Sequence, residues 1–290
     1  MEEIKKVAVL GTGVLGSQIA FQVAFSGFPV TVYDLNGELL EQARSRYAQL
    51  AATYEKQVAG ATPEKTSAAL ARLALSSDLA AVVADVDLVI EAVPEVLEIK
   101  QETFRKLAEL APAKTIFATN SSTLLPSDLK GATGRPDRFL ALHFANHIWV
   151  ANTAEVMGTT DTDPAVFEAV VGFAAAIGMV PIPMHKEKAG YIINSLLVPF
   201  LNAATELVAG GYASPEDVDK VWRIGVGAPV GPLQILDVIG LKTPYNILSH
   251  GTEHEQALAA WLKENYIDKG KLGVATGEGF YSYKKHKKAD

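Results

Sequence analysis

The segment HFANHIWVANTAE begins with His143 and ends with Glu155, two residue types that together can move a proton to and from a substrate. A histidine titrates near neutral pH, so its ring can both take up and return a proton. A carboxylate can fix the orientation of that ring and offset the charge of its protonated form. We therefore interpret His143 and Glu155 as a candidate acid–base pair. The alternative is a hydrogen-bonded histidine with a structural role.

The elements that must position this pair are predicted from the first half of the chain. Apolar, strand-like runs alternate there with helical stretches such as residues 100–111, and His143 directly follows the run at 138–142. This alternation indicates an α/β fold with a doubly wound, Rossmann-type parallel sheet that is buried on both faces. Ligands bind such sheets at the carboxyl ends of the strands. The candidate residues at or just past these ends are Glu91, Glu95, Asn120 and His143.

A dinucleotide-binding unit is indicated by KKVAVLGTGVLGSQIAFQVAFSGFPVTVYD, which has the order strand, glycine turn, helix, strand. Gly11 permits the tight turn, Gly13 lets the backbone approach a pyrophosphate, and Gly16 lets the helix pack closely on its strand. The helix start, with Val14 and Leu15, directs N–H groups and the positive end of the helix dipole at the phosphates. We expect these five residues to bind the cofactor.

Asp34 stands at the end of the second strand of this unit. A carboxylate there accepts hydrogen bonds from the ribose hydroxyls of NAD and repels the 2′-phosphate of NADP. The neighbouring sequence DLNGE offers no arginine that could bind that phosphate. We therefore expect NAD as the cofactor, against the alternative that Asp34 is only a turn residue.

The second half of the chain has the pattern of helices. A long apolar helix is predicted over residues 191–209, ended by Gly210 and Gly211, and SPEDVDKVW opens another helix with Ser214 as its N-cap. The long helix contains polar residues, which argues against a membrane span and favours a core or a subunit interface. We place the domain boundary after Pro183, with a NAD-binding domain over 1–183 and an all-helical C-terminal domain over 184–290.

The composition excludes several classes of function. The 290 residues suit two domains, at about 100 to 200 residues each. A net charge of −7 argues against nucleic acid as a partner. The absence of cysteine and of an apolar signal segment after Met1 leads us to expect a cytoplasmic protein. His250 and His254 have a spacing that binds metal on a helix, but no third ligand is evident, so we expect no metal site.

Seven motifs, in order along nearly the whole chain, resemble the 3-hydroxyacyl-CoA dehydrogenase family. They are GTGVLGSQIA, VIEAVPEVLEIKQETF, ATNSSTL, LHFAN with Glu155, AGYIINSLLVPFLNAA, GVGAPVGPLQILDVIGL and KLGVATGEGFYSY. Members of the family join a Rossmann-type domain to a helical dimerisation domain. The resemblance therefore implies a homodimeric, NAD-dependent oxidoreductase of fatty acid metabolism that acts on an acyl-CoA.

The resemblance also implies roles for individual residues. His143 and Glu155 match the catalytic pair of the family, and Ser122 and Asn194 match the residues that hydrogen-bond the substrate oxygen. The positions that match the cofactor side of the family's site are Glu95, Lys100 and, in the catalytic loop, Asn146.

Three of these residues have structural alternatives. Ser122 could cap a turn, Asn194 could cap or bridge helices, and Lys100 could lie on the solvated face of its helix.

Two segments depart from the family pattern. Members usually carry HFFNP, whereas here Ala145 replaces an aromatic residue and His147 replaces the proline. Loss of a proline frees the loop conformation, so the pocket wall is expected to differ. Relatives also place a lysine-rich turn for the CoA phosphates in an insert that here, as AATYEKQVAGATPEKT, holds only Lys56 and Lys65. Fewer cations weaken the capture of a polyanionic carrier.

We predict an NAD-dependent dehydrogenase that interconverts a short-chain (S)-3-hydroxyacyl-CoA, such as 3-hydroxybutyryl-CoA, with the 3-ketoacyl-CoA. The first alternative is the same chemistry on a free hydroxy acid or sugar acid, as in the gulonate dehydrogenase relatives. The second alternative is a non-catalytic NAD-binding or structural protein with the same fold.

Overall fold

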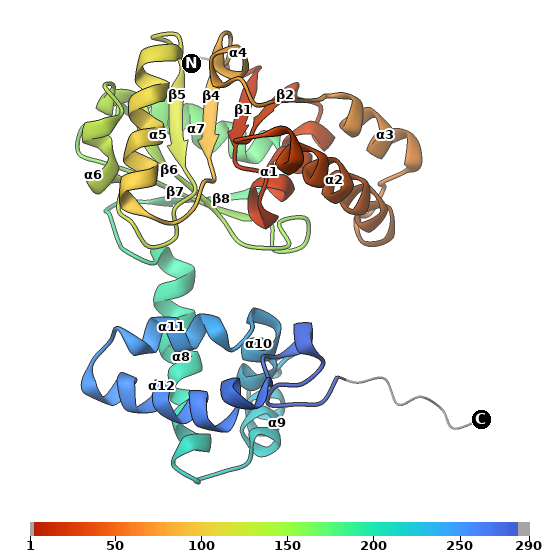
Figure 1. Ribbon diagram of the computed structural model, residues 1–290, viewed down its shortest axis with the longest axis vertical. Coiled ribbons are helices and arrows are strands. Elements are labelled where there is room, and N and C mark those ends of the chain that lie inside the picture. The colour runs from red at the N-terminus through yellow and green to blue at the C-terminus, as the bar shows by residue number, and fades with distance from the viewer. Residues whose placement is uncertain (1–2, 284–290) are drawn as a thin grey trace. The chain divides into compact units, whose positions relative to one another are not determined.

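The computed structural model describes residues 3–283, which form two compact units (Figure 1). The first unit ends at Ile192 and the second begins at Ile193. The domain boundary expected after Pro183 instead falls inside strand β8, Val180–Met184. This strand pairs in parallel with β7, Thr153–Gly158, so its residues still belong to the sheet of the first unit.

The first unit alternates strands and helices, as the sequence predicts. Its remaining strands are β1 (Val7–Leu10), β2 (Val30–Tyr33), β3 (Leu73–Ser76), β4 (Leu88–Glu91), β5 (Ile116–Thr119) and β6 (Phe139–Phe144). Its helices are α1 (Val14–Phe25), α2 (Gly37–Gln57), α3 (Pro63–Ala71), α4 (Leu79–Val83), α5 (Leu97–Leu110), α6 (Pro126–Leu129) and α7 (Pro164–Ala176), with short 3-10 turns at Lys130–Ala132 and Pro136–Arg138.

The strands form one sheet in the order β3-β2-β1-β4-β5-β6-β7-β8, eight strands within the described residues. The strands from β1 to β6 that lie side by side are parallel, whereas β7 is antiparallel to β6. The predicted doubly wound sheet is confirmed. The sequence reading missed β3 and β7, and it placed His143 after a strand although His143 is the penultimate residue of β6.

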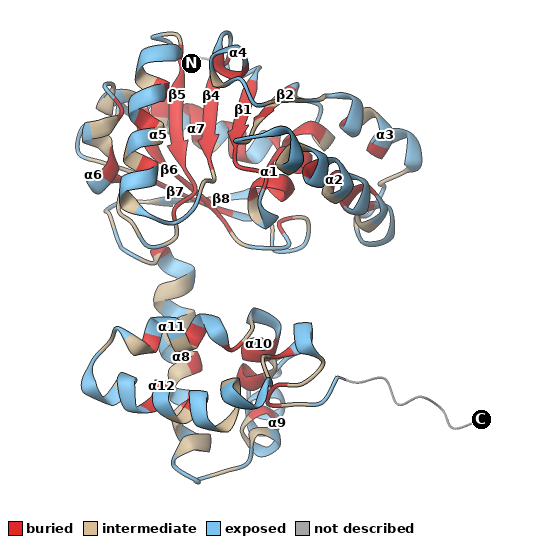
Figure 2. Cartoon of the chain, in the orientation of Figure 1, coloured by how far each residue is buried: buried red, intermediate tan, exposed pale blue. Residues whose placement is uncertain are grey.

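Helices cover both faces of this sheet, and its central strands β1, β4, β5 and β6 are buried (Figure 2). On one face, side chains of α1, α2 and α7, among them Ile19, Ala43 and Val170, pack on β1 and its neighbours. On the other face, α4 and α5 contribute Val83 and Phe104 to a second apolar cluster. The two clusters fix the strand ends, and the polar residues that follow those ends are therefore held in defined places.

The second unit is helical, as predicted. Its helices are α8 (Tyr191–Ala209, whose first two residues belong to the first unit), α9 (Pro215–Gly225), α10 (Pro232–Ile239), α11 (Lys242–Ser249) and α12 (Glu253–Asn265), with 3-10 turns at Ile267–Lys269 and Val274–Thr276. The predicted N-cap Ser214 accepts a hydrogen bond from Asp217 N at 3.2 Å. Gly211 has φ +71° after the end of α8, as expected of a glycine that terminates a helix.

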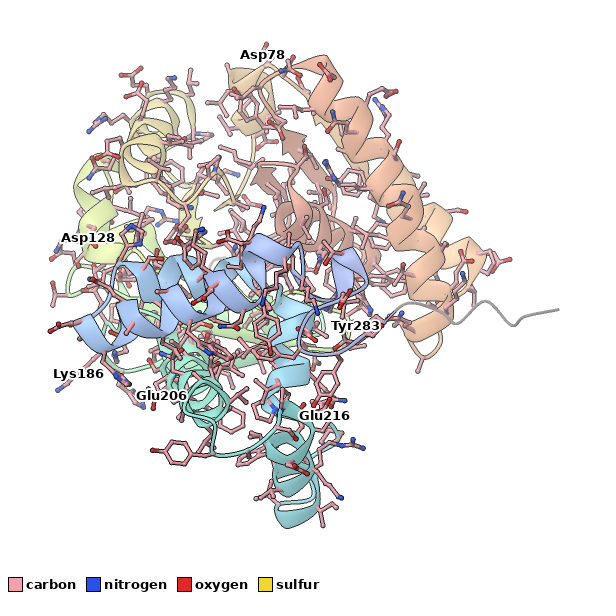
Figure 3. The ribbon with its side chains drawn as sticks, turned by 60° about the horizontal axis from the view of Figure 1, so that its bottom comes forward. Asp78, Asp128, Lys186, Glu206, Glu216 and Tyr283 are labelled. Carbon is pink, nitrogen blue, oxygen red and sulfur yellow. The ribbon has the colours of Figure 1, made fainter. Side chains whose placement is uncertain are left out.

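Buried carboxylates hold the C-terminal strap of the second unit. Asp237, 1% exposed, accepts hydrogen bonds from the backbone N–H groups of Phe280 and Tyr281. The Tyr283 hydroxyl donates to the same carboxylate at 2.9 Å, and Tyr283 is labelled in Figure 3. Because a buried carboxylate is costly unless its acceptor sites are filled, these bonds fix the strap GEGFYSY on α10.

Helix α8 is, among residues 3–283, the one helix long and apolar enough to cross a membrane by length and composition. It carries Pro199 and Glu206 within its length. Only 17% of its most apolar window is buried, so the interpretation as a core helix is less well supported than that of an interface helix.

Candidate active site

His143 and Glu155 lie directly opposite each other in the antiparallel register of β6 and β7. Paired residues of an antiparallel sheet project their side chains to the same face, about 5 Å apart at Cβ. His143 Nδ1 lies 2.9 Å from Glu155 Oε2, and both side chains are buried, at 4% and 5% exposure. The two residues of the opening motif therefore meet in the folded chain, and no distant element is needed to bring them together.

Ser122 completes a line of three polar groups. Its Oγ lies 3.0 Å from His143 Nε2, the ring nitrogen opposite the one that faces Glu155. A carboxylate only accepts hydrogen bonds, so Nδ1 carries the proton in the neutral ring and Nε2 is an acceptor. Ser122 follows the end of β5 and is partly exposed. The reactive face of the imidazole thus points to a place that a substrate oxygen can share with the serine hydroxyl.

Glu95 holds the backbone that carries Ser122. Its Oε1 accepts hydrogen bonds from Ser121 Oγ (2.6 Å), Ser122 N (2.9 Å), Thr123 N (2.8 Å) and Thr123 Oγ1 (2.8 Å). Partial burial disfavours the charged form, but these donors and the Lys100 ammonium outweigh it and lower the pKa of Glu95 to about 2. In this structure Glu95 is therefore an anchor for the NSST loop. Its expected role toward the nicotinamide stays a prediction.

Lys100 is buried, at 1% exposure, so the alternative of a solvated helix face is wrong. Its ammonium lies 2.6 Å from Glu91 Oε1, 3.2 Å from the Val93 carbonyl and 3.3 Å from Glu95 Oε2. Glu91 is fully buried and also accepts from Thr119 Oγ1 at 2.7 Å. Burial raises the pKa of Glu91, whereas these partners oppose the rise. In this structure the Lys100 ammonium thus pairs with the Glu95 carboxylate. The expected contact of Lys100 with the cofactor stays a prediction.

The glycine loop has the geometry that a pyrophosphate requires. Gly11 has φ +97°, and a Cβ there would lie 2.5 Å from the Ala92 carbonyl oxygen. A Cβ on Gly16 would lie 2.1 Å from the Gly11 carbonyl oxygen, so α1 can pack this closely only with glycine. A Cβ on Gly13 would meet nothing within 4 Å, so the loop is open beside the N-terminus of α1. That opening, next to the helix N–H groups, fits a dinucleotide phosphate.

Val14 and Leu15 form the first turn of α1, and Val14 is 67% exposed. They lie where the helix N–H groups face the open side of the glycine loop. Of the five expected cofactor residues, Gly13, Val14 and Leu15 are accessible, whereas Gly11 and Gly16 are buried.

Asp34 directly follows β2 and its carboxylate already serves the glycine loop. Oδ2 accepts from Thr12 N at 2.8 Å and also from the Thr12 hydroxyl, and Oδ1 accepts from Leu35 N at 2.8 Å. A carboxylate offers about four acceptor sites, so a ribose hydroxyl can still be bound. Arg46, which the sequence reading missed, donates to the Thr12 carbonyl at 2.8 Å from α2.

Two asparagines of the expected cofactor site differ in their surroundings. Asn120, 8% exposed, accepts a hydrogen bond from Phe144 N at 3.0 Å and so ties the end of β5 to the end of β6. Asn146 is exposed in the loop after β6. Asn120 thus has a structural contact in this structure, and the cofactor roles of both residues stay predictions.

The atypical loop after β6 is anchored to the nucleotide-binding helix. His147 has φ +60°, a conformation that a proline cannot adopt. Its N–H donates to the side chain of Gln18, on α1, at 2.8 Å. Trp149 Nε1 donates to Gln57, at the end of α2, at 2.7 Å. The loop is therefore held in a defined conformation that depends on the absence of proline, rather than simply freed, as the sequence suggested.

Two residues of the AGYIINSLLVPFLNAA motif, to which the sequence analysis gave no role, also reach the dyad. The ring of Tyr191 stacks on the His143 ring with centroids 4.2 Å apart and an interplanar angle of 13°. Ile192 N donates to Glu155 Oε1 at 2.8 Å. No local pattern marks these residues, because they look like the start of an ordinary apolar helix.

Asn194 lies on α8 in the second unit and is partly buried, and its role toward the substrate stays a prediction. His250 ends α11 and contacts the Asn246 carbonyl, whereas His254 lies on α12 and contacts Glu206, labelled in Figure 3. The two histidines thus do not share a helix, and residues 3–283 contain no cluster of three or more metal-ligating His, Cys, Asp or Glu side chains.

Comparisons with known proteins match both units. The family model described as "3-hydroxyacyl-CoA dehydrogenase, NAD binding domain" matches residues 6–188, and that described as "3-hydroxyacyl-CoA dehydrogenase, C-terminal domain" matches residues 190–283. The chain is 38% identical to a rat protein named "Hydroxyacyl-coenzyme A dehydrogenase, mitochondrial", over 97% of the chain and 92% of the relative. It is 34% identical to a Bacillus subtilis "Probable 3-hydroxybutyryl-CoA dehydrogenase", over 97% and 98%.

Solved structures include two informative matches. One, described as "Substrate-directed dual catalysis of dicarbonyl compounds by diketoreductase", is 65% identical, with a TM-score of 0.94 over 98% of this chain and 100% of the other. The (S)-3-hydroxybutyryl-CoA dehydrogenase of Ralstonia eutropha is 29% identical, with a TM-score of 0.84 over 98% and 100%.

Proposed function

The chain belongs to the 3-hydroxyacyl-CoA dehydrogenase family, an NAD-dependent oxidoreductase family, and we propose that it interconverts a 3-hydroxy and a 3-keto group by hydride exchange with NAD. The observation that carries this proposal is the line Ser122, His143, Glu155, with 3.0 Å and 2.9 Å between successive polar atoms. A scaffold that only bound NAD would have no need of such a line. The non-catalytic alternative is therefore the least supported.

In the proposed reaction His143 Nε2 exchanges a proton with the substrate oxygen, while NAD, when bound, exchanges the hydride with the substrate carbon. In the oxidation direction the ring takes the hydroxyl proton and becomes an imidazolium. Glu155 is held at Nδ1 and offsets that charge. The Ser122 hydroxyl donates a hydrogen bond to the substrate oxygen as negative charge develops there. We propose that Asn194 assists Ser122, in keeping with the family's pattern.

The first candidate substrate is a short-chain (S)-3-hydroxyacyl-CoA, such as 3-hydroxybutyryl-CoA. Relatives named as dehydrogenases of such thioesters align over almost all of this chain. The 3-ketoacyl unit needs little space, since only the keto oxygen and the neighbouring carbonyl must reach the dyad. Recognition of the CoA moiety would have to come from cations elsewhere on the protein.

A second candidate is a carrier-free substrate that keeps the keto group next to a second carbonyl, or a free hydroxy acid. Two observations favour it: the 65% identity to a structure described for dicarbonyl compounds, and the scarcity of cations in the segment of residues 51–66, at the end of α2 and the start of α3. Of its two lysines, Lys65 donates to the Gly60 carbonyl at 2.7 Å, which leaves Lys56 as the other cation for a CoA phosphate. No observation here singles out a sugar acid.

We also propose that the enzyme is a homodimer formed through the helical unit. Large apolar side chains on α8 and α9 are exposed in the single chain, among them Leu196 (69%), Val221 (72%) and Ile224 (75%). Exposed apolar surface of this kind marks interfaces between proteins. Light scattering with size-exclusion chromatography tests this proposal: a mass near twice the 30.9 kDa of the chain is expected, and a monomer would contradict it.

The function is tested by following NADH oxidation with acetoacetyl-CoA, with acetoacetate and with pentane-2,4-dione, each with the wild type and with His143→Gln. Turnover of the thioester with kcat/KM at least about 100-fold above the other two identifies the first candidate. Turnover of the carrier-free compounds at a similar or higher kcat/KM identifies the second. Loss of turnover in the His143→Gln variant with NADH binding retained supports the proton-transfer role in either case. Undiminished turnover of all three by the variant would contradict it.

A further inference from the structure

Two consecutive residues at the start of α8 hold the two members of the dyad. The Tyr191 ring lies on the His143 ring, almost parallel at 4.2 Å, and Tyr191 is fully buried. The next backbone N–H, of Ile192, donates to Glu155 Oε1 at 2.8 Å, while the other carboxylate oxygen faces His143 Nδ1. One dipeptide therefore contacts the histidine from its ring face and the glutamate at its second oxygen.

We propose that Tyr191 is a positioning residue for the reaction, which orients the His143 imidazole through its ring face. This inference rests on the proposed function, because it assumes that His143 transfers the proton. Tyr191 would then affect kcat directly, in addition to its packing contribution to the stability of the first unit. No group other than the aromatic ring of Tyr191 is required for the effect.

The physical reason is that contacts at Nδ1 and Nε2 alone leave the imidazole ring free to tilt. Nδ1 bonded to Glu155 and Nε2 near Ser122 fix the ring within its plane, but not its tilt about the line through the two nitrogens. A flat ring stacked at 4.2 Å blocks that tilt on one side. An aromatic face also favours a cation, and the imidazole becomes one when it takes the proton.

The backbone around Tyr191 indicates that its place is imposed by the surrounding structure. Tyr191 has φ +54°, in the left-handed region that a residue with a side chain seldom adopts. Such a conformation persists only where other contacts fix it. The segment before it is bound to the first unit at Ser127 N, which donates to Glu187 Oε1 at 2.7 Å, and at Lys188 N, which donates to Met157 Sδ at 3.2 Å.

A purely structural role is the competing explanation. Tyr191 forms a small apolar cluster with Ala141 and Met157, against which Met184 packs. If Tyr191 acted only through this cluster, any loss of packing volume there would have the same effect on activity. Met184→Ala removes such volume from β8 and leaves Tyr191, His143 and Glu155 themselves unchanged, and is therefore the matched control.

The test compares Tyr191→Phe, Tyr191→Leu and Met184→Ala with the wild type, in thermal unfolding, NADH binding and steady-state kinetics with whichever substrate the wild type turns over. We expect Tyr191→Phe to retain kcat within about 2-fold, because it keeps the ring. We expect Tyr191→Leu to lower kcat about 10- to 100-fold, as small misplacements of a catalytic group do, with the Kd for NADH unchanged. Met184→Ala should lower the melting temperature and leave kcat close to wild type.

A spectroscopic measurement separates ring orientation from packing. In protein labelled with 15N-histidine, the His143 signals should show a single Nδ1–H tautomer in the wild type and in Tyr191→Phe, and a mixture or exchange broadening in Tyr191→Leu. Should Tyr191→Leu fail to fold, Tyr191→Met, which keeps much of the volume without an aromatic face, takes its place and is expected to show the same loss of kcat.

Two results would overturn the inference. One is a Tyr191→Leu variant with wild-type kcat; the other is an equal loss of kcat in Tyr191→Leu and Met184→Ala. Failure of the proposed function is distinguishable, since there the His143→Gln variant itself would keep its activity. If Tyr191→Leu has a wild-type kcat and His143→Gln is inactive, the role of Tyr191 is contradicted and the proposed function stands.

Discussion

His143 and Glu155 are direct cross-strand partners in the antiparallel register of β6 and β7, with 2.9 Å between Nδ1 and Oε2. The pair is thus built into the backbone hydrogen bonding of the sheet. A shift of β7 against β6 by one residue would place the two side chains on opposite faces of the sheet. Because β6 is flanked by paired strands on both sides, such a shift is opposed by the whole sheet, and the relative placement of the two residues does not depend on a bound substrate.

Removal of the Ser122 hydroxyl tests its proposed contact with the substrate oxygen. We expect Ser122→Ala to lower kcat about 100-fold, the effect of losing one donor to a developing oxyanion, with little change in NADH binding. Ser127→Ala, an exposed serine of the same segment, is the control and should behave as the wild type. Equal kcat values for Ser122→Ala and Ser127→Ala would show that the hydroxyl does not act in the reaction.

Because of Glu95, the free energy of unfolding is expected to fall as the pH becomes acidic. Its pKa is lowered to about 2 in the folded protein, against about 4.5 for an ordinary glutamate in water, so its contribution is complete above about pH 4.5 and is lost as the pH falls toward 2. Because the side chain is 36% exposed, screening reduces the contribution to about 1 to 2 kcal/mol. Urea unfolding at pH 5 and pH 3 should show a smaller loss for Glu95→Gln than for the wild type. The same loss in both proteins would contradict this origin.

We predict that loss of Lys100 lowers the stability of the protein more than it weakens NADH binding. Lys100→Met leaves Glu91 buried without its cation, which costs about 3 to 5 kcal/mol. The double variant Lys100→Met/Glu91→Gln should recover at least half of the loss in free energy of unfolding, because no uncompensated charge remains. The measurement is urea unfolding together with the Kd for NADH. A stable Lys100→Met variant with weakened NADH binding would instead assign the lysine to the cofactor.

The conformation of the loop after β6 is testable at His147. His147→Pro combines an impossible φ with the loss of the N–H that binds Gln18, and should destabilise the protein by about 2 kcal/mol or more. His147→Asn tolerates the left-handed conformation and is expected to have wild-type stability. Thermal unfolding of the two variants decides the matter, and a fully stable proline variant would mean that the loop adopts another conformation.

The fold could be predicted from the sequence where the local residue types alone determine the backbone conformation. The glycine turn with Gly11, Gly13 and Gly16, and the cap of α9 at Ser214, follow from local backbone requirements that few residues meet. Strand β7 could not be recognised, because TAEVMG lacks a clear alternation and gains its strand conformation from pairing with β6 and β8. The boundary expected after Pro183 falls inside β8, because the strand continues to Met184, which still pairs with Met157 of β7.

Within the candidate site, residue types could be predicted, but not their neighbours. The meeting of His143 and Glu155 was expected from their chemistry and family pattern, whereas the register that produces it is a property of the sheet. Lys100 looks like a solvated helix position in the sequence, because its burial on α5 depends on its ion pair with Glu91 at the end of β4. Tyr191 lies on His143 only because the connecting segment binds elsewhere on the first unit, which no local pattern encodes.

The central claim, that His143 and Glu155 act as one proton-transfer unit, is tested most directly by single-turnover hydride transfer in His143→Gln, Glu155→Gln and the double variant. Each single variant is expected to lose about 100- to 10,000-fold in rate, and the double variant to lose little more than the worse single variant, because residues that act as a unit are not additive. Losses that multiply in the double variant, or a hydride-transfer rate that survives His143→Gln, would contradict the claim.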